Sequence, residues 1–188
     1  GISLMCGIYG FIEKNEAKLT LDHVIKMGEV INYRGPDDGD FYFENGVAIG
    51  NKRLSIIDVE GGKQPFYSDD MKVIVVQNGE IFNHIELSKE LKGTRYECRT
   101  NSDTEVILRL YEKFGISFLN KLNGMFAIAI YDLRQKKLFL ARDHVGEKPL
   151  YFYNDSNKLI FGSEIKSILA CDIAVSYTHM TLPTTMHV

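Results

Sequence analysis

The 188-residue chain has the length of a single domain, and its nearly balanced charge excludes several classes of protein. The formal net charge is −3 at pH 7, and the basic residues are interspersed with acids, which argues against nucleic-acid binding. No apolar stretch approaches the ~20 residues of a membrane-spanning helix, and the start lacks the features of a signal peptide. Three cysteines without metal-type spacing favour a reducing compartment, so we expect a cytoplasmic protein.

The first predicted elements are a strand over Cys6–Glu13 and an amphipathic helix that follows it. The apolar residues predicted to form one buried face of this helix are Leu21, Val24, Ile25, Gly28 and Ile31. Cys6 follows Met5, so removal of an initiator methionine would make the cysteine N-terminal. Such a residue combines a thiol nucleophile with an α-amine that titrates near ~7.7–8.0 and can act as its base. The alternative is an ordinary buried cysteine in a first strand.

The middle of the chain predicts two strands and two helices. The strands span Val47–Arg53 and Val73–Asn78. Ser102, three residues before Glu105, has the spacing of a capping box. Asn83, three residues before Glu86, is a weaker variant of the same pattern. The apolar stripe of the second helix consists of Val106, Ile107, Leu110, Tyr111 and Phe114.

The last part of the chain predicts two strand pairs. Met125–Asp132 and Lys137–Arg142 form one pair, and Leu150–Tyr153 and Lys158–Gly162 form the other. Strands joined by short turns favour antiparallel sheets, and the apolar run over 125–131 implies burial on both faces. An α+β fold with two antiparallel sheets between helix layers satisfies both observations.

Five sequence motifs follow the first cysteine in a fixed order. They are Arg34–Asp38, Arg53–Asp58, Asn78–Asn83, Ser102–Ile107 and Arg142–Tyr151. Together with Met5–Phe11, these motifs resemble class II glutamine amidotransferase domains of the asparagine synthetase branch. The resemblance covers Met5 to about Ala170. It implies a glutaminase domain with the four-layer αββα sandwich of N-terminal-nucleophile hydrolases.

The resemblance implies L-glutamine as the substrate, and motif residues can be matched to its charged groups. Arg53 is the candidate for the α-carboxylate, because its planar guanidinium can pair with two oxygens; Ile56 of the same motif is assigned to the substrate pocket. Asp103 is the candidate for the α-ammonium, with Glu80 as a second acceptor. The structural alternatives are a surface arginine at a strand end, a helix-terminal acid that favours the dipole and an exposed turn glutamate.

Asn78 and Gly79 are the candidates for stabilising the oxyanion that forms when Cys6 attacks. Glycine permits a tight backbone turn close to a substrate, where the Asn78 amide and the Gly79 N–H could both donate. The alternative is an Asn-Gly hairpin turn. The segments 34–39 and 143–149 are predicted loops near the site, and His144 stands where the family more often has arginine.

We expect a glutaminase domain over 5–170, an upstream extension over 1–4 and a non-native or disordered tail over 171–188. Residues 173–188 contain no Asp, Glu, Lys or Arg, and no Ser-Gly-Gly-x-Asp-Ser pyrophosphate loop is present, so we expect the synthetase domain to be absent. No metal or organic cofactor is expected for the glutaminase domain. The family implies ATP and Mg only for the synthetase domain.

The expected partners are L-glutamine and a synthetase domain or subunit that accepts ammonia, but neither nucleic acid nor a membrane. A homodimer is left open. Two other functions also stay open at this point. One is a non-catalytic glutamine-binding or regulatory module, and the other is a self-processing N-terminal cysteine hydrolase that acts on a different amide.

Overall fold

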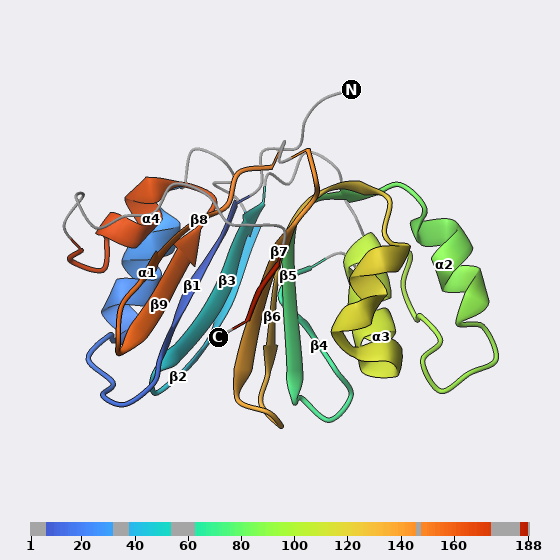
Figure 1. Ribbon diagram of the computed structural model, residues 1–188, viewed down its shortest axis with the longest axis horizontal. Helices are drawn as coiled ribbons and strands as arrows, with labels where there is room; N and C mark the ends of the chain where they lie inside the picture. Colours follow the sequence, from blue (N-terminus) through green and yellow to red (C-terminus); the bar gives the residue numbers. More distant parts are fainter. Residues whose placement is uncertain (1–6, 32–37, 54–62, 146–147, 174–184, 188) are drawn as a thin grey trace.

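The computed structural model describes residues 7–31, 38–53, 63–145, 148–173 and 185–187, without the side chains of residues 38, 39, 53 and 185–187. Two antiparallel sheets of five strands each pack face to face, and helices cover the outer face of each sheet (Figure 1). This arrangement confirms the predicted α+β fold, a four-layer αββα sandwich.

The first sheet has the strand order β2-β3-β1-β9-β8, with β1 at its centre. Its strands are β1 (Gly7–Glu13), β2 (Asp38–Glu44), β3 (Val47–Arg53), β8 (Tyr151–Asn154) and β9 (Lys158–Gly162). Helices α1 (Leu21–Glu29) and α4 (Ile165–Leu169) pack on its outer face. The four strands predicted in this part of the chain are confirmed to within one residue. The predicted loop over 34–39 is wrong at its end, because β2 begins at residue 38 and pairs with β3.

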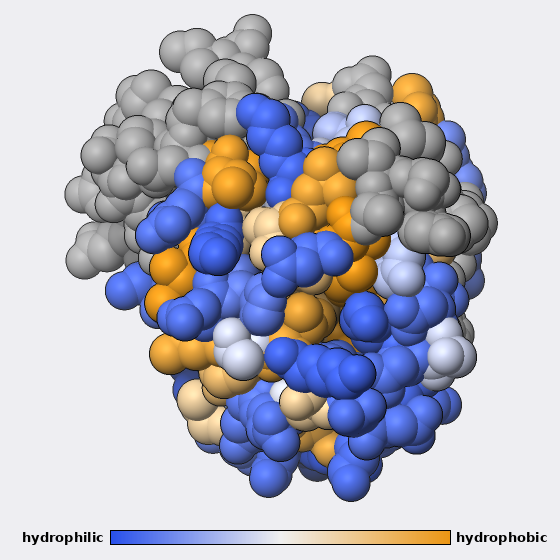
Figure 2. Space-filling model, turned by 90° about the vertical axis from the view of Figure 1, so that its left-hand side faces the viewer, coloured by the Kyte–Doolittle hydropathy of each residue, from blue (hydrophilic) through white to orange (hydrophobic). Residues whose placement is uncertain are grey.

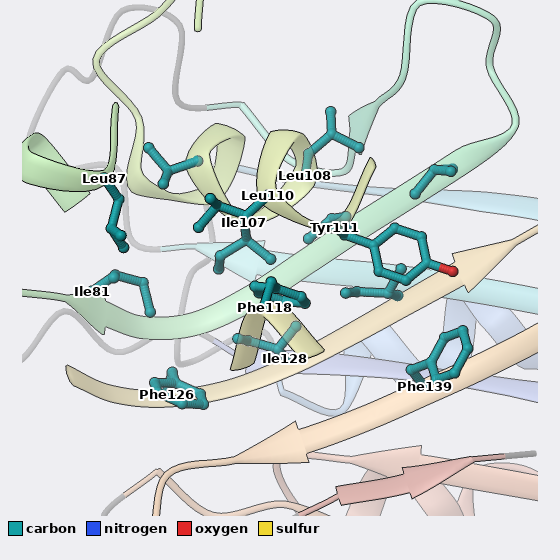
Figure 3. Packing of buried hydrophobic residues seen from close by; sticks show 14 of the residues in the cluster. Ile81, Leu87, Ile107, Leu108, Leu110, Tyr111, Phe118, Phe126, Ile128 and Phe139 are labelled. Atoms are coloured by element: carbon teal, nitrogen blue, oxygen red, sulfur yellow. The ribbon is translucent and has the colours of Figure 1, made fainter. Parts of the chain in front are cut away.

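The second sheet has the strand order β10-β7-β6-β5-β4. Its strands are β4 (Phe66–Tyr67), β5 (Val73–Ile81), β6 (Gly124–Asp132), β7 (Lys137–Arg142) and β10 (Thr185–His187). The helices on its outer face are α2 (His84–Glu90) and α3 (Asp103–Phe114), followed by the 3-10 helix η1 (Gly115–Lys121). Figure 3 shows how apolar side chains of α3 pack against β5 and β6. The ring centroids of Tyr111 in α3 and Phe139 in β7 are 5.7 Å apart. The predicted β6–β7 hairpin is confirmed.

Strand β10 pairs antiparallel with β7, with Thr185 opposite Ala141. It lies within the segment 171–188 for which we predicted a non-native or disordered tail. The boundaries of the domain and of this tail stay predictions. Among the helices in the described residues, none is long and apolar enough to cross a membrane.

Helix α1 buries only part of the face that its sequence pattern predicts. Val24, Gly28 and Ile31 are buried as predicted, but Leu21 and Ile25 are 45% and 39% exposed, and Met27 is buried instead. A Cβ atom at position 28 would lie 2.8 Å from the Tyr9 hydroxyl oxygen, so glycine lets α1 approach β1 closely along this line. Figure 2, which views the side of the molecule that carries α1 and α4, shows apolar side chains at the surface among polar ones.

Both predicted helix caps are only half right. Ser102 caps α3 by accepting a hydrogen bond from the Thr104 N–H, but Glu105 does not reach back to it. The Glu105 carboxylate is buried and instead accepts from the backbone N–H groups of residues 99 and 100. Asn83 precedes α2 as predicted, yet its side chain bonds to Lys121 and Asn123 and so ties the end of β5 to the start of β6.

Candidate active site

The predicted nucleophile and the predicted carboxylate anchor are attached to neighbouring strand ends. Gly7, which follows Cys6, pairs with Lys52, which precedes Arg53. Cys6 and Ile56 lie outside the described residues, and Arg53 is described only as the last backbone position of β3. Ser163 fixes the start of β1, because its backbone N–H donates to the Ile8 carbonyl and its side-chain oxygen accepts from the Ile8 N–H.

The end of β5 lies at the same end of the sandwich as these strand ends. Tyr42 of β2 contacts the rings of Tyr67 and Tyr131 in the second sheet, each with ring centroids 6.5 Å apart. From this contact β3 runs toward Arg53 and β5 runs toward Asn78. Figure 1 shows that β1 begins and β5 ends on the same side of the molecule. The sequence-predicted residues 53, 78, 79 and 80 therefore approach one edge of the inter-sheet space.

Asn78 and Gly79 do not form a turn, so both the tight turn and the hairpin alternative are wrong. They lie inside β5, which continues in register with β6 to Ile81. Gly79 has a φ of +133°, and a Cβ atom at this position would overlap the backbone carbonyl of Met125. Glycine is thus needed here for the close approach of two strands and for a backbone conformation that other residues rarely adopt.

The register leaves the backbone of Gly79 outside the β5–β6 hydrogen bonds. Its partner Phe126 instead donates its N–H to the Asp143 carboxylate at 3.1 Å and accepts from the Asp143 N–H at 3.0 Å. Residues opposite each other in antiparallel strands alternate between bonded and non-bonded pairs, which makes Gly79–Phe126 a non-bonded pair. The Gly79 N–H consequently points away from β6, as a donor to a ligand would require.

Asp103 lies beside the end of β5, at the first turn of α3. Its Oδ2 atom accepts a hydrogen bond from the Ile81 N–H at 2.9 Å, a contact that the sequence pattern does not predict. The side chain is half-buried, and this bond occupies one of its two carboxylate oxygens. Glu80, which precedes Ile81 in β5, is exposed. The structure thus brings Asp103 and Glu80 to the same strand end as Gly79.

A buried polar network, missed in the sequence, holds α3 against β5. The Gln77 N–H donates to Gln64 Oε1 at 2.7 Å, and Gln77 Nε2 donates to Thr104 Oγ1 at 3.0 Å. Gln64 Nε2 also donates to Thr104 Oγ1, at 3.3 Å. Because Thr104 follows Asp103 and Gln77 precedes Asn78, this network fixes the position of one candidate residue relative to the other.

The two described cysteines are unsuited to nucleophilic catalysis. Both are free thiols, and Cys171, which follows α4, is buried, so that its pKa is raised to about 12. Burial also raises the pKa of Cys98. Since the thiolate is the reactive form, neither is an activated nucleophile near neutral pH. Cys6 therefore keeps its place as the candidate nucleophile.

A separate cavity of about 260 Å³ lies on the helix side of the second sheet, between η1 and the end of β7. Its lining includes Leu119, Leu122, Phe126, Asp143, His144 and Val145. It includes none of the predicted site residues that the structure describes. Among the described ranges, no group of three or more His, Cys, Asp or Glu side chains could hold a metal ion. The expectation that this domain needs no cofactor stays a prediction.

Comparisons with known proteins agree with this fold and these motifs. The chain belongs to the glutamine amidotransferase domain family, whose sequence model matches residues 5–187. Glutamine-hydrolyzing asparagine synthetase 2 of Bacillus subtilis is 42% identical over 169 residues, which cover 88% of this chain and 22% of the relative. Glutamine-hydrolyzing asparagine synthetase B of Escherichia coli is 38% identical over 167 residues, covering 88% of this chain and 30% of the relative.

This chain therefore spans roughly a quarter of the length of these two relatives. Among solved structures, the chain resembles glutamine phosphoribosylpyrophosphate amidotransferase from B. subtilis in complex with ADP and GMP, with a TM-score of 0.74 and 18% identity. The match covers 97% of this chain and 47% of that one. It supports the N-terminal-nucleophile hydrolase fold that the sequence predicts.

Proposed function

We propose that this chain hydrolyses the side-chain amide of L-glutamine at Cys6 and releases ammonia for a synthetase partner. Its membership of the glutamine amidotransferase domain family and its similarity to asparagine synthetases named as glutamine-hydrolyzing support the substrate and the reaction. Asparagine synthesis is the pathway we propose for the ammonia. The synthetase part of these longer relatives is the proposed acceptor, whether as a domain or as a separate subunit.

The observation that carries the proposal is the geometry at the end of β5. Asn78 is buried in strand β5, and the Gly79 N–H next to it points away from β6. Both groups lie at the edge of the sandwich where β1 begins. The first residue of β1 is Gly7, which directly follows Cys6. Two donors that converge on one oxygen stabilise an oxyanion, and this is the role we propose for the Asn78 amide and the Gly79 N–H.

The proposed reaction begins when the Cys6 α-amine takes the thiol proton and the sulfur attacks the amide carbon of glutamine. The C=O electron pair moves to oxygen, where the Asn78 amide and the Gly79 N–H donate hydrogen bonds. The C–N bond then breaks, the protonated amine returns its proton to the leaving nitrogen, and ammonia departs from a thioester. Water, deprotonated by the same amine, attacks the thioester and yields glutamate and the free thiol.

Substrate selection in this proposal rests on complementary charge. Arg53 would bind the α-carboxylate, with Ile56 beside it, while Asp103 and Glu80 would accept hydrogen bonds from the α-ammonium. A buried cation or anion is costly without a partner, so both charges of the free amino acid are used for recognition. No cofactor takes part in this half-reaction. ATP and Mg belong only to the synthetase partner, and a cytoplasmic location completes the proposal.

The test is a glutaminase assay on protein shown by mass spectrometry to begin with Cys6. The proposal predicts ammonia release that Cys6→Ala abolishes. Saturable glutamine binding without ammonia release, measured by calorimetry, would instead identify a binding or regulatory module. Turnover of another amide that survives both Arg53→Ala and Asp103→Ala would identify a cysteine hydrolase of a different substrate.

A further inference from the structure

Two buried amide side chains in the inter-sheet space have complementary unpaired atoms. Asn51 Nδ2 and Asn78 Oδ1 are both buried, and neither forms a hydrogen bond with any residue that the structure describes. The two residues are only 2% and 1% exposed. A buried donor or acceptor without a partner costs free energy. One unpaired atom here is a donor, and the other is an acceptor.

Strand alternation directs both side chains between the sheets. Ile49 of β3 and Val76 of β5 belong to the inter-sheet core, and Asn51 and Asn78 each lie two residues further along the same strand. Asn51 pairs with Ile8 of β1, and Asn78 pairs with Ala127 of β6. Ile8 and Ala127 are members of the same inter-sheet cluster, so the two amides lie in one region of the core.

A third unpaired atom does not belong to this region. Gln77 Oε1 is also buried without a partner among the described residues. The Gln77 side chain, however, points to the opposite face of β5, where it donates to Thr104 of α3. Asn51 is therefore the buried donor that shares the inter-sheet face with Asn78.

We propose that Asn51 is a positioning residue, which donates to Asn78 Oδ1 directly or through one water when glutamine is bound. This inference rests on the proposed function. An oxyanion donor must present Nδ2 of Asn78 to the reacting oxygen, and a hydrogen bond to Oδ1 prevents the amide from turning over. Such bonds are often long without substrate and tighten only in the complex. In this proposal Asn51 acts through Asn78 and makes no contact with the substrate.

Asn51→Leu is the variant that tests this role, because it removes the donor while keeping a similar volume. On protein that begins with Cys6, we expect kcat for glutamine to fall by about tenfold or more, since small misplacements of a catalytic group are costly. KM should change by less than about twofold, because binding groups elsewhere are untouched. The melting temperature should stay level or rise, because an unpaired buried amide has been replaced by an apolar group. Asn51→His, which keeps an N–H donor, should recover part of the lost kcat.

A double-mutant cycle with Asn78→Ala separates positioning from a general packing effect. If Asn51 acts through Asn78, Asn51→Leu should add almost no further loss of kcat in the Asn78→Ala background. Two outcomes would overturn the role of Asn51 but not the proposed function. One is that Asn51→Leu lowers kcat as much in the Asn78→Ala background as in the parent, and the other is that Asn51→Leu leaves the kcat of an active parent unchanged. A parent without any glutaminase activity would instead overturn the proposed function.

Discussion

The two helix layers are attached to their sheets by different kinds of interaction. Helix α1 packs on β1 through apolar side chains and the close approach at Gly28. Helix α3 has an apolar face too, but its N-terminal end is also bound to β5 by the hydrogen bonds of Asp103 and Thr104. A further buried hydrogen bond joins α3 to the same sheet, from the Tyr111 hydroxyl to the Asp132 carboxylate of β6. Directional bonds of this kind fix the position of a side chain more narrowly than burial does, which suits a layer that must hold substrate-binding groups.

The largest predicted difference is in the reactivity of two cysteines next to elements on the α1 side of the sandwich, Cys6 before β1 and Cys171 after α4. Burial raises the pKa of Cys171, in the α1–α4 layer, to about 12. At pH 7 its thiolate fraction, and hence its alkylation by iodoacetamide, should be about a thousandfold below that of an ordinary thiol. Mass spectrometry of the time course should show Cys6 modified first. Equal labelling of Cys6 and Cys171 in folded protein would contradict the assignment of Cys6 as the reactive thiol.

Alanine at two closely packed glycines, Gly79 near the candidate site and Gly28 in α1, should distinguish the site layer from the scaffold layer. Gly79→Ala forces a strained φ and an overlap with β6, so we expect a loss of at least about 2 kcal/mol in unfolding free energy. Displacement of the oxyanion donor should also lower kcat about 10²-fold. Gly28→Ala meets the Tyr9 hydroxyl, and it should cost about 1 kcal/mol while leaving kcat unchanged. Denaturant titration and steady-state kinetics measure both effects, and equal kcat losses would remove the distinction.

The carboxylate at the start of α3 should affect substrate binding rather than folding. Asp103→Asn keeps an oxygen that can accept from the Ile81 N–H but removes the charge that would face the substrate ammonium. We expect KM for glutamine to rise about tenfold to a hundredfold, with little change in melting temperature. Asp172→Asn is the matched control, since Asp172 contacts His23 on the α1 side of the molecule. If Asp103→Asn changes stability but not KM, Asp103 is structural only.

The smallest effects should come from single side chains on the two helices, one buried against β5 and one exposed. Thr104→Val removes the hydroxyl that accepts from Gln77 and Gln64, and should cost about 1–2 kcal/mol of unfolding free energy. Ile25→Ser on the exposed side of α1 should stay within about 0.5 kcal/mol. Thermal and denaturant unfolding would test the pair. Equal losses would mean that α1 depends on its outer apolar side chains.

Much of this fold could be predicted from the sequence, because most strands form hairpins with nearby partners. The β6–β7 pair is an example, since its register follows from local alternation and a short turn. The exposure of Leu21 and Ile25 could not be predicted, because which apolar side chains of α1 are buried depends on how the helix packs on β1 and α4. The same holds for Glu105. Its carboxylate accepts from the backbone N–H groups of residues 99 and 100, before the helix, and from Arg109 within it, so its capping-box spacing is misleading.

The candidate site shows a similar division. The residue types and motifs that suggest Asn78, Gly79 and Asp103 can be found in the sequence alone. The local Asn-Gly signal nevertheless favours a turn, and pairing with β6 overrides it along nine residues of β5. The unpaired amide of Asn51 carries no sequence signal, since its burial follows from strand alternation and the packing of two sheets.

The most direct test of the central claim compares two forms of this chain that differ only at the N-terminus. One retains Gly1–Met5, so that the nitrogen of Cys6 is an amide and cannot act as a base. The other begins with Cys6, and mass spectrometry verifies both termini before ammonia release from glutamine is measured. We predict glutaminase activity only in the form with the free Cys6 amine, with similar melting temperatures for both. Robust activity in the form that retains Gly1 would contradict the mechanism and require another base for the thiol.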